Sequence, residues 1–145
     1  MKRIILVLIG FAPLPLGFLT NFFMMYRNFM PRLIIMGILI LVAWFIFGML
    51  STKLVAQRKE AVLLLNTPAI LILLSLLLQE LILRRFFTNT IGTLVLYFYL
   101  PVVSLGNIFA RITSVASISG GASVAFVLML IASYLGRRVA ERAKE

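Results

Sequence analysis

The stretch LIIMGILILVAWFIFGML, residues 33–50, decides the fold class. It contains no charged residue and is almost long enough to span a membrane as a helix. A helix needs about 20 mainly apolar residues to cross a bilayer core of about 30 Å. Further apolar runs of this kind occupy residues 4–26, 61–83, 91–110 and 115–135. We therefore predict an all-α, polytopic transmembrane bundle of about five hydrophobic helices, forming a single membrane domain that ends in a polar tail at 136–145.

The composition agrees with a membrane protein and excludes an ordinary soluble domain. Of 145 residues, 63% are hydrophobic and 12% are charged, and the mean hydropathy is +1.14. The net charge of +10 comes from 14 Lys and Arg against 4 carboxylates. These basic residues stand in small groups between the apolar runs, where they anchor helix ends at phospholipid headgroups. We expect the lipid bilayer as partner and no nucleic acid.

Three residue types that carry much of enzyme chemistry are missing, because the chain contains no Cys, His or Asp. Without them no disulfide, thiolate or imidazole metal site, Ser–His pair or Asp dyad can form. We therefore expect a protein that is not an enzyme, with no cofactor and no metal.

The first apolar run begins after Lys2 and Arg3, as a signal peptide would, but it continues past Pro13 and Pro15 with no small-residue cleavage site. A retained membrane segment is the simpler interpretation. Each proline removes a backbone donor and clashes with the preceding turn. The segment is therefore predicted to be a kinked helix or a re-entrant hairpin, and the hairpin would leave four crossings.

The third run contains Asn66-Thr67-Pro68, an arrangement typical of a helix start. Two structures remain open on this evidence. The helix either continues through Pro68 with a kink, or it begins at Pro68 and leaves residues 54–65 as a short interfacial helix. Pro101 is likewise expected to bend the fourth helix. Short connections predict antiparallel neighbours, with consecutive helices in contact.

Orientation follows from the distribution of Lys and Arg, whose excess normally stays in the cytoplasm. Five crossings place 6 of them on the N-terminal side and 8 on the other, which favours a cytoplasmic C-terminus. A re-entrant first segment changes the split to 10 against 4. Insertion in both directions, as an antiparallel dimer, is a third possibility. In each case we expect a multi-pass protein of the cell membrane.

Glu80 is the carboxylate that stands within an apolar run, and charged groups at membrane depth are costly and often functional. The spacing permits a structural ion pair with Arg84, four residues later on the same helix face. The other hypothesis is a role in transport, proton coupling or partner binding, together with Gln79 and with Asn107 of the fourth run.

Small residues recur every four positions in the fifth run and predict a close helix contact. This row consists of Ser117, Gly121 and Ala125, with Ala132 further along, and a shorter version in the fourth run consists of Gly106 and Ala110. Because short-looped helices must pack on one another, we favour contacts within the chain over contacts with a second subunit.

These features support two functional hypotheses. The first is a non-enzymatic membrane component that acts through helix–helix contacts, such as an accessory subunit, an immunity protein or an assembly factor, with a membrane protein or a second copy as partner. The alternative is a small oligomeric transporter or channel with a pathway near Glu80, Gln79 and Asn107. The sequence contains no motif that chooses between them.

Overall fold

The computed structural model describes residues 2–26, 32–82, 90–112 and 118–143, and all regular structure in these ranges is helical. The prediction of an all-α bundle of about five hydrophobic helices is confirmed. The elements in chain order are α1 (Lys2–Gly10), α2 (Pro13–Tyr26), α3 (Leu33–Leu50), η1 (Ser51–Lys53), α4 (Arg58–Leu77), the π-helical turn η2 (Leu78–Ile82), α5 (Thr90–Ile112) and α6 (Ile118–Arg142).

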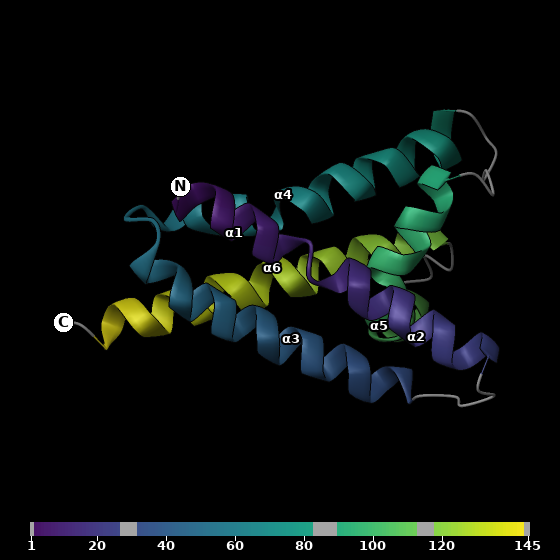
Figure 1. The fold of residues 1–145 in the computed structure, drawn as a ribbon, viewed down its shortest axis with the longest axis horizontal. Helices are drawn as coiled ribbons and strands as arrows, with labels where there is room; N and C mark the ends of the chain where they lie inside the picture. The colour runs from purple at the N-terminus through teal and green to yellow at the C-terminus, as the bar shows by residue number, and fades with distance from the viewer. Residues whose placement is uncertain (1, 27–31, 83–89, 113–117, 144–145) are drawn as a thin grey trace.

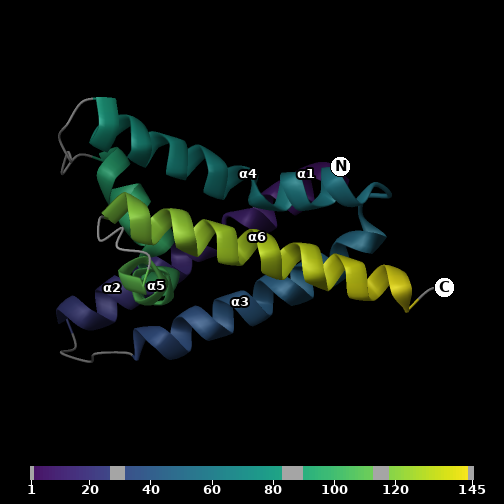
Figure 2. The same cartoon turned by 180° about the vertical axis from the view of Figure 1, so that it is seen from behind.

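Within the described ranges, four helical segments are long and apolar enough to cross a membrane: Lys2–Tyr26, Leu33–Lys53, Arg58–Glu80 and Ser119–Arg142. They run between the two ends of the molecule, whereas α5 lies across them near one end (Figures 1 and 2). The helix α5, Thr90–Ile112, has 23 residues, so its direction and not its length distinguishes it from the other four. As a result, the N-terminus and the C-terminus lie at the same end, together with the connection between α3 and α4.

The first segment is a bent helix. It breaks at Phe11 and Ala12, directly before Pro13, and α2 then continues in the same general direction as α1 (Figure 1). The re-entrant hairpin is therefore not the structure of this segment. Pro13 is the first residue of α2, the position at which a missing N–H costs a helix least. The bend packs closely on α4, since a Cβ built on Gly10 would lie 2.3 Å from the carbonyl oxygen of Leu65.

The third segment is one continuous helix through Pro68, so the version that begins at Pro68 with a separate interfacial helix is wrong. Asn66 does not cap a helix start. Its amide donates to the carbonyl oxygen of Val62, one turn earlier in α4, at 2.9 Å. Residues 54–57 lie outside regular helix. Asn66 and Ala69 are fully buried, so tertiary packing on both sides of the proline holds the helix together despite the lost hydrogen bond.

Helix packing follows chain order only in part. The expected contact between consecutive helices is confirmed for α4 with α5 and for α5 with α6, but not for α3, whose main partners are α6 and α5 and whose contacts with α4 are few. The reason is the close approach of α3 to α6. A Cβ built on Gly48 would lie 2.2 Å from the carbonyl oxygen of Ser133, and one built on Gly136 would lie 1.9 Å from that of Phe45. Side chains at these two glycines would separate the helices.

Candidate functional site

A buried hydrogen-bonded cluster joins α3, α4 and α6 inside the bundle. The indole N–H of Trp44 donates to Oδ1 of Asn66 at 3.1 Å, and Nδ2 of Asn66 donates to Oγ of Ser133 at 3.0 Å. Ser133 in turn donates to the carbonyl oxygen of Leu130 at 2.9 Å. All three polar side chains are almost completely buried. In an apolar surrounding such a satisfied network fixes the relative positions of the helices.

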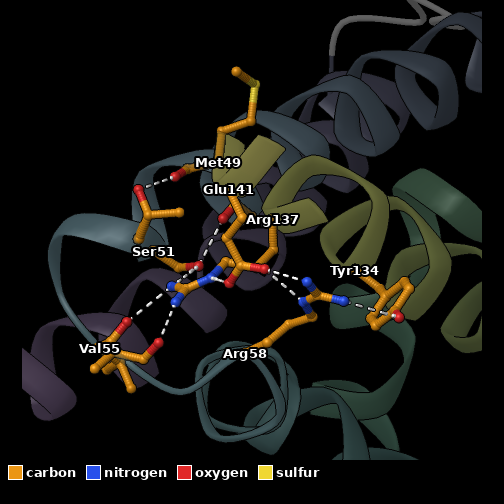
Figure 3. Close-up of polar contacts among 10 residues, drawn as sticks. Met49, Ser51, Val55, Arg58, Tyr134, Arg137 and Glu141 are labelled. Carbon is orange, nitrogen blue, oxygen red and sulfur yellow. Dashed lines mark hydrogen bonds and ion pairs between the residues drawn. The ribbon is translucent and has the colours of Figure 1, made fainter. Parts of the chain in front are cut away.

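A second cluster lies at the end where the two termini meet, and its centre is the guanidinium of Arg137, whose side chain is 3% exposed (Figure 3). Arg137 donates to the carbonyl oxygens of Val55 at 2.9 Å and Ala56 at 2.7 Å, and to Oγ of Ser51 at 3.3 Å. Its Nε donates to Glu141 at 2.6 Å. The side chain thereby ties the non-helical connection between α3 and α4 to α6.

Glu141 also binds a second arginine, and this links α6 to the first turn of α4. Arg58 donates from Nε to Oε2 of Glu141 at 2.6 Å, and its Nη1 donates to the hydroxyl of Tyr134 at 3.4 Å (Figure 3). The guanidinium carbon lies 5.7 Å from the centre of the Tyr134 ring, within the range of a cation–π contact. One carboxylate thus bridges two cations, and the cluster keeps a net positive charge.

Beside this cluster, an apolar groove with a volume of about 360 Å³ runs between α4 and α6. Its lining is provided by Lys59, Val62, Leu63, Leu130, Ile131, Tyr134 and Leu135. The groove is open on one side, and Leu63 and Ile131 on its walls are about half exposed. Lys59 and Tyr134 are the residues that give it a polar mouth.

Glu80 lies near the opposite end and faces the first turn of α6. Its Oε2 accepts a hydrogen bond from the backbone N–H of Ser119 at 3.1 Å. The first backbone N–H groups of a helix lack partners within the helix and carry a partial positive charge. Glu80 therefore acts as a cap supplied by another helix, an arrangement that the sequence spacing did not predict.

Gln79 and Asn107 lie near the same helix start. Gln79 is 3% exposed, and its Oε1 has no hydrogen-bond partner within the described part of the chain. Asn107 is exposed as a residue, but its Oδ1 lies only 2.0 Å from the point that a Cβ on Gly121 would occupy. Gln79 and Glu80 both stand in the π-helical turn η2, a deviation from α-helix that is common at functional sites.

The small residues of the predicted rows meet one another where α5 crosses α6. A Cβ on Gly106 would lie 2.1 Å from the carbonyl oxygen of Gly121 and 3.2 Å from Cβ of Ala125. Ala132 packs against the core. Ala110 belongs to α5, but its side chain is outside the described part, and Arg84 and Ser117 lie outside the described residues altogether. The proposed ion pair between Glu80 and Arg84 therefore stays a prediction.

Sequence reasoning assigned no role to Trp44 and Asn66 as a pair, and it treated Arg137 as part of a solvated tail. A signal for Arg137 was present. The four-residue spacing of Gly121 and Ala125 continues along α6, through Met129, Ser133, Arg137 and Glu141. Such an i±4 row is the inclined ridge by which helices pack, and its members up to Arg137 are buried.

These clusters supply ion pairs, hydrogen bonds and an apolar groove. Within the described residues no group of three or more His, Cys, Asp or Glu could hold a metal ion. Comparison of the chain with protein-family models, with curated proteins and with solved structures finds no match.

Proposed function

We propose that this chain is a non-enzymatic membrane component that acts through contacts of its lateral surface in the bilayer, as an accessory, immunity or assembly protein does. The observation that carries the proposal is the use of its polar side chains. Within the apolar spans many of these groups bond to the chain itself, with Oε1 of Gln79 and Oγ of Ser104 as buried exceptions in the described part of the chain, and large apolar residues dominate the outward surface. We expect such a protein to act through the shape of its outward surface and not through catalysis.

The hydrogen bonds support this separation between polar contacts within the chain and an apolar outward surface. Asn66 and Ser133 join three helices, and three further hydroxyls donate to the carbonyl oxygen one turn earlier in their own helix. These are Thr20 to Leu16, Thr67 to Leu63 and Ser75 to Leu71. The glycines likewise serve contacts within the chain. The exposed large side chains of α3 are Ile, Leu and Val.

We further propose that the protein resides in the cell membrane with both termini in the cytoplasm. The support is the arrangement of four long segments with α5 across one end. If those four segments cross, 9 Lys and Arg belong by sequence position to the end that carries the termini, and 5 belong to the other. An excess of this kind marks the cytoplasmic side. This count differs from the one expected for a re-entrant first segment, because here the first segment crosses and α5 does not.

The test is site-specific photo-crosslinking in native membranes. A photoreactive amino acid replaces one exposed residue at a time, at Ile38 on α3, Leu71 on α4 and Val127 on α6, which are 50%, 57% and 47% exposed. We expect a discrete cross-linked protein band from one face and none from the others. Buried Leu65 provides the control for nonspecific reaction. Cross-links to lipid alone at all three exposed positions would contradict the proposal.

One observation favours the transporter as second candidate: the buried Oε1 of Gln79 without a described partner, next to Glu80 in a π-helical turn. Polar groups in interrupted helices are where transporters bind substrates. The variant Glu80→Gln should then abolish ion- or proton-dependent flux in liposomes. Unchanged flux would remove that carboxylate from any pathway.

A further inference from the structure

The groove between α4 and α6 differs from the rest of the outward surface because one end of it is cationic. Lys59 lines the groove and is exposed. Arg138 and Arg142 are exposed as well, and they follow Leu135 of the groove by three and seven residues, a helical spacing that places them on the same face of α6. None of the three forms an ion pair with another described residue. Three cations that have no ion pair within the described ranges therefore stand near the mouth of the apolar groove.

The nearby carboxylate does not neutralise this charge. Glu141 is held by Arg137 and Arg58 at the same time. Two cations thus share one anion, and Arg58 is further fixed against Tyr134, which itself lines the groove. The local field at the mouth is positive, and its geometry is set by hydrogen bonds that join α4 and α6.

The walls of the groove are unsuited to a transmembrane helix. Helices approach closely in lipid where small residues line the contact, as Gly48 and Gly136 do between α3 and α6. Along the α4–α6 groove the wall residues are Val62, Leu63, Leu130, Ile131 and Leu135, with no glycine, alanine or serine. Such walls leave a slot for a thin, flexible chain. Its size is in the range of ligand pockets.

We propose that this groove binds one anionic phospholipid, with an acyl chain between α4 and α6 and the phosphate at Lys59, Arg138 and Arg142. Tyr134 lines the groove beside Arg58, and aromatic side chains of this kind are enriched at membrane interfaces. The inference goes beyond the proposed function, since a bound lipid is compatible with either candidate. The cation-lined end is the end that carries both termini, for which we propose a cytoplasmic location, and cytoplasmic leaflets are rich in anionic lipids.

Native mass spectrometry of the full chain, delipidated in mild detergent, tests the proposal. The probes are phosphatidylglycerol and phosphatidylcholine with identical acyl chains. We expect the protein to retain one phosphatidylglycerol and to release phosphatidylcholine. Equal retention of the two lipids would overturn the charge recognition. A photoreactive residue at Leu63 should capture lipid in membranes, and capture of a polypeptide there would assign the groove to a partner helix.

Matched variants separate this site from general membrane attraction. Lys59→Gln should weaken phosphatidylglycerol binding roughly fivefold, the factor for one basic contact at a membrane surface. Lys53→Gln removes an exposed lysine at the same end but outside the groove lining, and should have no effect. Leu63→Trp fills the groove and should abolish retention, whereas Leu39→Trp, at a residue equally 58% exposed on α3, should not. Equal effects within either pair would overturn the site.

Discussion

Glu80 accepts a hydrogen bond from the backbone N–H of Ser119, 39 residues later in the chain. A carboxylate from the third span thereby stabilises the start of the last helix. This contact ties the two helices together at the end opposite the termini.

Replacing Glu80 should destabilise the bundle through the start of α6. Loss of a side-chain cap and of its charge near a helix N-terminus costs about 1 kcal/mol. We expect Glu80→Ala to lower the apparent melting temperature in detergent, and Glu80→Gln to lower it less because an acceptor oxygen remains. The control is Ser75→Ala on the same span, which removes only a hydroxyl bonded within its own helix. Equal melting of the two alanine variants would contradict the capping role.

Arg137 should be far less replaceable than its neighbour Arg138. Arg137→Met leaves the carbonyl oxygens of Val55 and Ala56 without their donor, and an unpaired buried group such as the Val55 carbonyl costs about 1–3 kcal/mol. Arg138 is exposed, so Arg138→Met should leave the melting temperature nearly unchanged. Thermal unfolding followed by circular dichroism measures both. Similar losses would show that Arg137 does not hold the connection between α3 and α4.

Replacement of Asn66 should change both the stability of the bundle and the environment of Trp44, which is the single tryptophan of the chain. Asn66→Leu removes the acceptor of the indole N–H and the donor to Ser133. Hydrogen bonds between membrane helices contribute about 0.6 kcal/mol on average, so we expect a modest destabilisation. The fluorescence maximum should move to shorter wavelength. Ser75→Ala, at a hydroxyl bonded within its own helix, should change neither the stability nor the fluorescence maximum. An unchanged spectrum for Asn66→Leu would contradict the predicted effect on Trp44.

The crossing of α3 and α6 should not tolerate side chains at its glycines. In Gly48→Val the new Cβ would meet the carbonyl oxygen of Ser133 at 2.2 Å. Overpacking of this kind costs about 1–3 kcal/mol. We expect early unfolding or aggregation on size-exclusion chromatography for Gly48→Val and Gly136→Val. Ala143→Val adds volume at an exposed position and should behave as the native protein does. Normal chromatographic behaviour of both glycine variants would show that the helices lie further apart.

The absence of native cysteines makes the proposed topology directly measurable. Single cysteines introduced by Lys53→Cys and Ala143→Cys should be labelled from the cytoplasmic side by a membrane-impermeant maleimide. Arg32→Cys should be labelled from the other side, because Arg32 precedes α3 at the opposite end. Labelling of Lys53→Cys and Ala143→Cys from opposite sides would mean that α5 crosses as well.

The helix bundle was predictable because apolar length is a property of the chain itself. The run at 33–50 has the bounds of α3, and Pro13 marks the break of the first segment. The continuity of α4 through Pro68 was not predictable. A local pattern indicates where a helix is able to start, whereas burial of Asn66 and Ala69 against other helices decides that it does not start there.

The candidate site was likewise predictable only in part. Glu80, Gln79 and Asn107 were identifiable as polar groups in apolar surroundings, but their nearness to the start of α6 depends on how α5 crosses it. The four-residue row of α6 indicated the burial of Arg137, but its carbonyl acceptors were not predictable because they lie more than 80 residues away.

The amino-acid sequence by itself determined that the chain forms helices long and apolar enough to cross a membrane, and that no Cys, His or Asp is available for chemistry. Only the tertiary structure decided that α5 lies across the other helices, that both termini share one end, and that Lys59 stands at an apolar groove. The physical reason is that hydrophobicity and hydrogen-bonding capacity are properties of each residue and can be added up along the chain. The partner of a polar group depends instead on which helices cross, and therefore on residues that are distant in the sequence.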